Sequence, residues 1–301
     1  MMRKALLFFL VLLLLPLQAV AEETGVPAPL FDESVTWPAL SWEEKVSPIE
    51  PHQDCFLPDN GGYHDDSLDI RIETFRQHDT TVMALYITLR DVSQFRAGTA
   101  SYRAPWNNTT TVDRMAQRFH AVLAINGDYF GYHEEGIVCR NGVVLRCRPV
   151  KHRDALLVHK NGDLSVLLAP TLEAWESVRD DVLHAFCFGP ALVVDGQVNE
   201  AARDTDMDIG KIKPTQRIAI GQLGPLQYLV VATEGPENPG SVGFTLMEIA
   251  QLMADMGCSV AYNLDGGSSS TVALNYRKIN ALSTGKNRPV SDCIWFATLV
   301  P

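Results

Sequence analysis

The sequence predicts an α+β fold with a large mixed β-sheet, several hairpins and a few packed helices. Three observations support this class. Short runs of apolar or alternating residues, typical of strands, recur along most of the chain. Several of these runs are separated by turn dipeptides such as Asn-Gly, which favour hairpins. Helical periodicity is confined to two segments, so strands outnumber helices.

The N-terminus predicts a signal peptide over residues 1–21. Arg3 and Lys4 precede an apolar run over residues 5–15, and Ala19-Val20-Ala21 fits the small-x-small cleavage rule. The run is too short to span a bilayer, so we expect cleavage near Glu22 and no transmembrane segment afterwards. The mature protein is then secreted or held in the cell envelope.

Two regions follow the signal peptide. Residues 22–62 are rich in proline and acidic residues, and they predict an extended N-terminal segment that straps the domain surface. Residues 63–301 predict the folded domain. Four hairpins are expected in it: strands over 68–72 and 82–89, the run 137–145 broken by Asn141-Gly142, the run 155–168 broken by Asn161-Gly162, and the run 217–232 turning near Gly224-Pro225.

Two helices and two buried strands complete the expected elements. Residues 112–120 predict a short helix, and residues 245–257 predict a second one, which Thr245 and Glu248 begin with a capping box. Apolar runs over 121–125 and 259–264 predict buried strands. Both runs end in a polar, glycine-containing motif, and we expect the strand ends at Asn126 and Asn263 to meet and, with Asp128, Asp265 and Arg217, to line one pocket.

The charge balance argues against two kinds of partner. The chain has 36 acidic and 25 basic residues, for a formal net charge of −11. An acidic protein repels nucleic acid and anionic membranes, so neither is expected as a partner. An anionic substrate would have to be met by a local group of Arg or Lys residues.

The six cysteines leave the disulfide state open. Export permits disulfides, and an even count is compatible with three bridges or with buried thiols and one bridge. No Cys-x-x-Cys pair is present, so the sequence does not predict a zinc ribbon or a thioredoxin-type site. The cysteines are Cys55, Cys139, Cys147, Cys187, Cys258 and Cys293.

The stretch from Asn263 to Ser270 is the most informative part of the sequence. The strand over 259–264 delivers the Asp265 carboxylate at its end. Gly266 and Gly267 follow, which allows the backbone to approach a ligand closely. Ser268 and Ser269 then offer hydroxyl donors that suit phosphate or sugar oxygens.

A second motif repeats this arrangement. Asn126-Gly127-Asp128-Tyr129 places an amide, a carboxylate and an aromatic ring at the end of the strand over 121–125. Two arginines are candidate phosphate ligands, because a guanidinium binds phosphate in bidentate fashion. Arg217 stands at the start of an apolar strand, and Arg288 lies in Lys-Asn-Arg-Pro-Val.

Taken together and in this order, the motifs resemble the phosphodiester glycosidase family, which includes the lysosomal uncovering enzyme and bacterial exopolysaccharide-associated proteins. The resemblance covers residues 115–300. Two departures are visible. Ser268 stands where the family often has a third glycine, and Gln216 stands where it often has proline.

The resemblance implies hydrolysis of a sugar-1-phosphodiester, here in a cell-envelope or exopolysaccharide glycan. Asp265 is the first choice for the catalytic carboxylate, followed by Asp128 and Glu234. The expected substrate-binding residues are Asn126, Gly127, Tyr129, Arg217, Asn263, Gly266, Gly267, Ser268, Ser269 and Arg288.

Two other functions stay open at this level. A non-catalytic envelope glycan-binding protein would use the same amides and aromatic rings. A metal-dependent phosphodiesterase would bind a cation through Asp128, Asp265 and a histidine such as His133 or His152, or would bind Ca²⁺ or Mg²⁺ through carboxylates and carbonyls. No His-Glu-x-x-His or Gly-x-Ser-x-Gly motif is present, which disfavours a zinc enzyme or a serine hydrolase.

Overall fold

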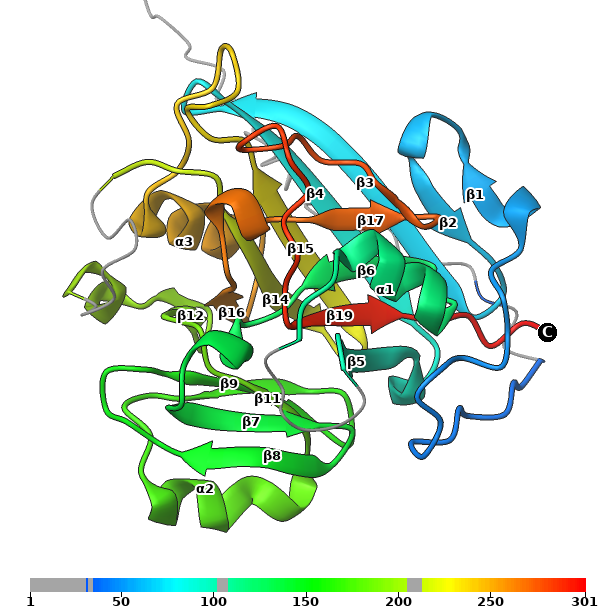
Figure 1. Ribbon diagram of the computed structural model, residues 1–301, viewed down its shortest axis with the longest axis horizontal. Coiled ribbons are helices and arrows are strands. Elements are labelled where there is room, and N and C mark those ends of the chain that lie inside the picture. The colour runs from blue at the N-terminus through cyan, green and yellow to red at the C-terminus, as the bar shows by residue number, and fades with distance from the viewer. Residues whose placement is uncertain (1–30, 32–34, 102–107, 205–212) are drawn as a thin grey trace, which may run out of the picture.

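The computed structural model describes residues 31, 35–101, 108–204 and 213–301 (Figure 1). The predicted signal peptide lies outside these residues. None of the helices in the described part of the chain is long and apolar enough to cross a membrane.

The α+β class is confirmed, with strands in three sheets and three α-helices among the described residues. The large sheet has the strand order β1-β2-β3-β4-β15-β14-β16-β12-β13. Its strands are β1 (Phe56–Leu57), β2 (Gly62–His64), β3 (Leu68–Gln77), β4 (Thr80–Leu89), β12 (Ala191–Val194), β13 (Gln197–Val198), β14 (Ile218–Gly224), β15 (Gln227–Thr233) and β16 (Val260–Asn263).

The other two sheets have five strands each. The second sheet has the order β18-β17-β6-β19-β5, and the small sheet has the order β10-β9-β11-β7-β8. The second sheet contains β5 (Phe95–Thr99), β6 (Leu123–Asn126), β17 (Val272–Leu274), β18 (Arg277–Lys278) and β19 (Asp292–Phe296). The small sheet contains β7 (Gly136–Arg140), β8 (Val143–Arg148), β9 (Ala155–His159), β10 (Leu164–Leu167) and β11 (Val182–Phe186).

The expectation of a mixed sheet needs correction, because every pairing between named strands in the described residues is antiparallel. The pairs include β6 with β17, β14 with β16 and β15 with β4. Short turns explain much of this pattern, since a two-residue turn joins only antiparallel neighbours. All four expected hairpins are present, as β3–β4, β7–β8, β9–β10 and β14–β15.

The helices follow their predicted signals closely. Helix α1 spans Val112–Phe119, and α3 spans Leu246–Asp255. The predicted capping box begins α3: the Glu248 amide donates to the Thr245 hydroxyl at 3.2 Å, and the Thr245 amide donates to the Glu248 carboxylate at 2.7 Å. The sequence analysis did not predict α2 (Leu172–Val178), which is two turns long and buries mainly Trp175.

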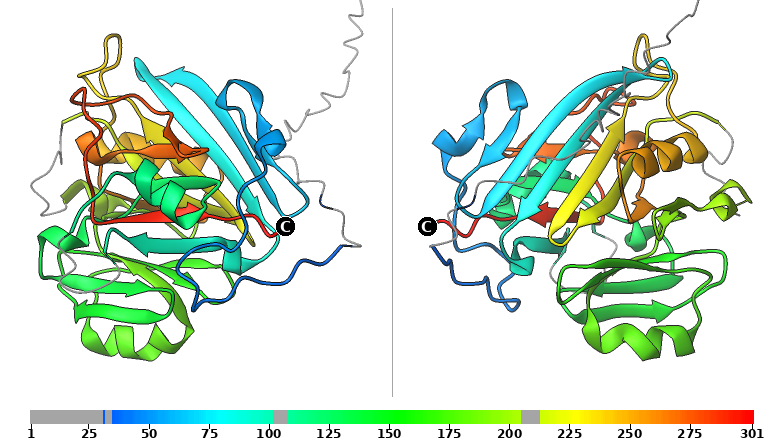
Figure 2. Two further views of the ribbon diagram at one scale, coloured as in Figure 1. Left: turned by 45° about the vertical axis from the view of Figure 1, so that its right-hand side comes forward. Right: turned by 180° about the vertical axis from the view of Figure 1, so that it is seen from behind.

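The main core lies between the large sheet and the second sheet. Ile87, Ile220 and Val230 of the large sheet pack in one cluster with Ile125 and Ile294 of the second sheet. Helix α3 packs on the outer face of the large sheet, and α1 packs on the outer face of the second sheet. The small sheet and α2 lie below these layers (Figures 1 and 2).

The described part of the predicted N-terminal segment has two different forms. Residues 35–50 contain no helix or strand and lie against the α1 side of the second sheet, where Leu40 is buried and Trp37 is partly buried. Farther along, β1 joins the edge of the large sheet by pairing with β2. The six cysteines all lie among the described residues, and all six are free thiols.

Candidate active site

The two polar motifs meet, as expected from their places at strand ends. Strand β6 of the second sheet ends at Asn126, and β16 of the large sheet ends at Asn263. The Asn126 Nδ2 donates to the Asp265 carbonyl at 2.7 Å, and the Asp265 amide donates to the Gly127 carbonyl at 3.3 Å. The candidate site therefore lies where these two sheets converge.

Asp265 combines burial with an unsatisfied carboxylate oxygen. Its side chain is only 6% exposed, and Oδ2 is buried without a hydrogen-bond partner among the described residues. Burial raises the pKa of Asp265 from 3.8 to about 6, while Ser269, Arg288 and Asp128 exert smaller effects. A buried carboxylate with a free oxygen and a raised pKa is typical of an acid–base residue.

Hydroxyl groups and one guanidinium surround Asp265 on its C-terminal side. The Arg288 guanidinium donates to the Ser268 hydroxyl at 3.3 Å, and its charge lowers the pKa of Asp265. The hydroxyls of Ser269 and Ser270 are buried and lack partners in the described chain. This side of the site offers a cation and hydroxyl donors, which suit an anionic oxygen.

Asp128 is held in a buried ion cluster. Its side chain is fully buried, and Arg140 Nη2 contacts both Asp128 Oδ1 at 3.0 Å and Asp292 Oδ2 at 2.6 Å. Asp128 Oδ2 also accepts from the Cys187 amide at 2.8 Å. Both oxygens of Asp128 are thus used inside the protein, which fits a supporting part better than direct contact with substrate.

This cluster contains two carboxyl groups and only one guanidinium group among its described members. Burial and the nearby Asp128 carboxylate raise the pKa of Asp292, although Arg140 opposes them. Burial alone would lower the pKa of Arg140, but Asp128 and Asp292 together raise it, so Arg140 stays charged. Removal of the arginine would leave two carboxylates buried side by side.

Two glycines of the motifs are required by close packing. A Cβ atom on Gly127 would lie 2.2 Å from Asp292 Oδ2, and one on Gly266 would lie 2.8 Å from the Gln216 carbonyl. Gly267 has a φ of 55°, in the left-handed region. These glycines therefore position the chain around Asp265, and their contact with substrate stays a prediction.

Arg217 lies immediately before β14, and Glu234 lies immediately after β15. Arg217 is 3% exposed, and its Nε donates to the Phe244 carbonyl at 2.9 Å. Burial lowers the pKa of Arg217 to about 10, and the charge of Glu248 acts in the opposite direction. Glu234 accepts from the Ser241 hydroxyl at 2.5 Å. Neither contact places the side chain against Asp265, so both roles stay predictions.

Asn263 and Tyr129 contact two neighbouring residues, Gly189 and Phe188. The Asn263 Nδ2 donates to the Gly189 carbonyl at 2.8 Å, and its Oδ1 is buried without a partner in the described chain. Tyr129 adopts a left-handed conformation with a φ of 66°. Its ring stacks on Tyr132 with centroids 4.7 Å apart and meets Phe188 edge-on at 6.3 Å.

Arg140 and Asp292 were not predicted from the sequence. A signal was available, because each is a charged residue in a strand of otherwise apolar or small residues, Gly-Ile-Val-Cys-Arg for β7 and Asp-Cys-Ile-Trp-Phe for β19. A charge in a buried strand needs a partner of opposite sign. The pairing of Arg140 with Asp292 could not be predicted, since the two residues are 152 positions apart.

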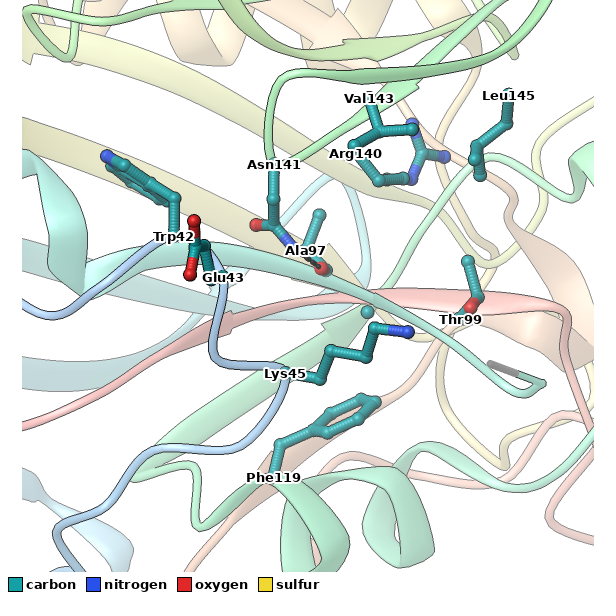
Figure 3. A pocket seen from close by; sticks show the side chains of 11 residues that line it. Trp42, Glu43, Lys45, Ala97, Thr99, Phe119, Arg140, Asn141, Val143 and Leu145 are labelled. Atoms are coloured by element: carbon teal, nitrogen blue, oxygen red, sulfur yellow. Dashed lines mark hydrogen bonds between the residues drawn. The ribbon is translucent and has the colours of Figure 1, made fainter. Parts of the chain in front are cut away.

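A cavity of about 230 Å³ lies apart from Asp265, between the N-terminal segment and strand β5 (Figure 3). The described residues that line it include Arg140 but neither Asp265 nor Asp128. Arg140 therefore belongs both to the wall of this cavity and to the ion cluster. Its walls are Trp42, Glu43, Lys45, Ala97, Gly98, Thr99, Phe119, Arg140, Asn141, Val143 and Leu145.

The divalent cation of the metal-dependent alternative has no ready-made set of ligands in the described part of the chain. In the described ranges, no group of three or more His, Cys, Asp or Glu side chains is placed to hold a metal ion. His152 pairs with Glu135 at 3.3 Å, and His133 binds the Glu135 carbonyl at 3.1 Å, so neither histidine joins Asp265.

Comparison with known proteins identifies the family. The sequence model of the phosphodiester glycosidases matches residues 119–297, which is more than half of the chain. The protein belongs to the phosphodiester glycosidase family. This confirms the resemblance carried by the motifs, and both of the motifs that meet at Asp265 lie within the matched residues.

The individual proteins that resemble this chain have low sequence identity to it. The chain is 28% identical over 201 residues to the SPbeta prophage-derived uncharacterized protein YomE of Bacillus subtilis (strain 168), a match that covers 65% of this chain and 31% of YomE. The fold is similar to the catalytic domain of zebrafish N-acetylglucosamine-1-phosphodiester α-N-acetylglucosaminidase, with a TM-score of 0.63, 17% identity, and coverage of 79% and 86% of the two chains. A hypothetical protein from Synechocystis has a TM-score of 0.53 at 16% identity, over 76% and 62% of the chains.

Proposed function

We propose that this protein is an exported glycosidase that hydrolyses a sugar-1-phosphodiester bond in a cell-envelope or exopolysaccharide glycan. The observation that carries the proposal is the Asp265 carboxylate, buried at the meeting point of the two motifs with an unpartnered oxygen. Family membership supports the class of reaction. The zebrafish relative is named for activity on an N-acetylglucosamine-1-phosphodiester, which makes this sugar the first substrate to test.

The proposed hydrolysis requires only a few functional groups from the protein. The bond between the anomeric carbon and the phosphate oxygen breaks, water adds to the anomeric carbon, and the phosphate leaves as a monoester of the other alcohol. The leaving group is already an anion, so a cation and hydrogen-bond donors are sufficient to stabilise it. The anomeric carbon gains positive charge, which a nearby carboxylate stabilises.

Different residues at and around Asp265 would stabilise the anomeric carbon and the leaving phosphate. Asp265 would act as an ionised carboxylate, either by stabilising the charge at the anomeric carbon or by taking a proton from water. Arg288 and Ser268 are the groups best placed to meet the phosphate, because they are bonded to each other beside Asp265. Asn126 would hold the site together, since both ends of its amide bind backbone groups of Asp265 and Thr271.

A turnover assay tests the proposal directly. The purified protein would be incubated with a panel of sugar-1-phosphodiesters that includes N-acetylglucosamine, with and without a chelator, and the released sugar and phosphomonoester would be measured. Equal amounts of both products are expected. Binding without turnover across the panel would favour the glycan-binding alternative, and loss of turnover with the chelator would favour a metal-dependent enzyme.

Export is a separate part of the proposal. It rests on the N-terminal sequence alone, which lies outside the described residues. N-terminal sequencing of the protein made by its own host is expected to begin near Glu22. An intact Met1 on protein recovered from the cytoplasm would contradict export and would leave the proposed reaction untouched.

A further inference from the structure

A cluster of basic side chains lies beside the candidate site, on the side of Tyr129. Arg146 of β8 donates to the carbonyls of Phe130 and Glu135 at 3.0 and 3.2 Å. Arg153 donates to the Cys187 carbonyl at 3.3 Å and contacts His133 Nε2 at 3.5 Å. The segment that follows Tyr129 therefore holds both arginines close to the site.

Neither arginine has a carboxylate partner within the described residues. The two other arginines of the same hairpin are paired: Arg140 with Asp128 and Asp292, and Arg148 with Glu134 at 3.0 Å. The chain carries 36 acidic and 25 basic residues, so carboxylates are in excess. Two half-buried arginines bound only to neutral groups are unusual in such a protein, and they leave their charge available to an anion.

His133 is neutral in this arrangement. Its Nδ1 contacts the Glu135 carbonyl at 3.1 Å, so Nδ1 carries the hydrogen and Nε2 accepts from Arg153. Burial lowers the pKa of His133, and the charges of Arg153 and Arg146 lower it further. The two guanidinium groups thus supply the positive charge, and the histidine orients Arg153.

Aromatic rings border the basic cluster. Tyr129 stacks on Tyr132 with an interplanar angle of 13°, and Tyr132 is 51% exposed. His133 lies 5.7 Å from the Tyr129 ring. The exposed ring of Tyr132, stacked on the partly buried Tyr129, offers a flat surface on which the apolar face of a sugar ring can pack.

Backbone and ring contacts connect this surface to Asp265. Tyr129 meets Phe188 edge-on, Gly189 follows Phe188, and Asn263 donates to the Gly189 carbonyl at 2.8 Å. Asn263 and Asp265 lie two residues apart at the end of β16. A short series of contacts therefore links the tyrosine pair to the end of β16, where Asp265 follows.

We propose that Arg146, Arg153 and the Tyr129–Tyr132 pair form a subsite for an anionic sugar, one that carries a carboxylate or a phosphate group. The sugar ring packs on the tyrosines and its anionic group binds the guanidinium groups. Placing this sugar next to the cleaved bond rests on the proposed function. The substrate would then be a glycan with a charged group on the sugar unit at this side of Asp265.

Binding measurements test the subsite without turnover. Glucuronic acid and glucose 1-phosphate are the anionic probes, glucose is the neutral probe, and calorimetry measures the dissociation constants. Arg153→Gln and Arg146→Gln are each expected to weaken binding of the anionic probes by about tenfold or more, since a hydrogen bond to a charged group is lost. Glucose is expected to bind weakly to all three proteins.

Two control variants locate the anion. Arg148→Gln removes a charge two positions from Arg146 on the same strand, and it is expected to bind the probes like the unchanged protein. Arg288→Ala removes the cation beside Ser268. Binding of glucuronic acid that is lost in Arg288→Ala and retained in Arg153→Gln would place the anion at Ser268 and overturn the subsite, as would equal losses in Arg148→Gln and Arg153→Gln.

The two proposals can fail separately. If the protein binds glucuronic acid through Arg153 but hydrolyses no phosphodiester, the subsite stands and the proposed reaction is wrong. If phosphodiesters are hydrolysed while Arg153→Gln alters neither anion binding nor the preference for charged substrates, the reaction stands and the subsite is wrong.

Discussion

The side-chain amide of Asn126 donates a 2.7 Å hydrogen bond to the carbonyl of Asp265, although 139 positions separate these residues. Its other end accepts from the Thr271 amide at 2.9 Å. One buried side chain at the end of β6 thus fixes both the start and the end of the loop that contains Ser268 and Ser269.

Replacement of Asn126 by alanine is expected to loosen this loop. It leaves the Thr271 amide and the Asp265 carbonyl buried without their partner, which costs on the order of 1–3 kcal/mol for an unsatisfied group. Urea denaturation would show the loss, and turnover would fall with it. Asn161→Ala is the control, because the exposed Asn161 bonds only within its own turn. An Asn126→Ala protein as stable and active as the control would contradict this function of Asn126.

Arg140→Met tests the ion cluster. Asp128 and Asp292 would be left buried without a cation, and breaking a buried ion pair in this way costs about 3–5 kcal/mol. We expect a large drop in the midpoint of thermal unfolding. Arg148→Met, which breaks the exposed pair with Glu134, is expected to stay within about 0.5 kcal/mol of the unchanged protein. If the two variants unfolded at similar temperatures, the ion cluster would contribute little to the stability of the fold.

The sequence predicted local features well and long-range pairing poorly. The Thr245–Glu248 capping box and the Asn-Gly turn at 141–142 depend on neighbouring residues, and both are present as expected. Two motifs at strand ends were enough to predict that they meet at Asp265. The burial of Arg217 could not be foreseen, since it depends on Phe244, 27 positions away, and on the packing of α3.

Arg140 is a second residue whose long-range contacts could not be predicted from the sequence. Whether a charged residue in a strand faces water or a buried carboxylate depends on the sheet that packs against it. The sequence placed Asp128 among the catalytic candidates because it stands in a motif, whereas the structure shows both of its oxygens bound inside the protein.

The stability of the unchanged protein relative to Asp265→Asn is expected to depend on pH. Burial raises the pKa of Asp265 from 3.8 to about 6, so the folded state holds the proton more tightly than the unfolded state does. The free energy of unfolding therefore falls as pH rises from about 4 to about 6, by up to roughly 3 kcal/mol. Asparagine does not titrate, so this fall in the free energy of unfolding is absent in Asp265→Asn.

Denaturation at pH 4 and pH 8 measures the effect. Asp265→Asn should gain stability relative to the unchanged protein on going from pH 4 to pH 8. Asp180→Asn is the control, because the Asp180 side chain is 98% exposed, and it should show no such gain. The raised pKa would be contradicted if Asp265→Asn and the unchanged protein differed in free energy of unfolding by the same amount at pH 4 and at pH 8.

Arg288 and Arg217 should respond differently to replacement by alanine. Arg288 bonds to Ser268 beside Asp265, so Arg288→Ala is expected to raise KM for a phosphodiester by about tenfold or more with little change in stability. Arg217 is buried and bonded to the Phe244 carbonyl, so Arg217→Ala is expected to lower stability as well as to weaken binding and slow turnover. An unchanged KM in Arg288→Ala would remove Arg288 from the phosphate site, and unchanged stability and kinetics in Arg217→Ala would remove Arg217 from it.

The rate of Asp265→Asn on a sugar-1-phosphodiester that the unchanged protein hydrolyses tests the central claim most directly. The substitution keeps the shape of the side chain and removes its charge. We predict a folded protein with nearly unchanged KM and with kcat lowered by about 10²–10⁴-fold, since a positioned carboxylate contributes a factor of this size. We also predict that kcat/KM of the unchanged protein falls as pH drops through about 6, where Asp265 of the substrate-free protein gains its proton. A correctly folded Asp265→Asn protein with full activity would contradict the account.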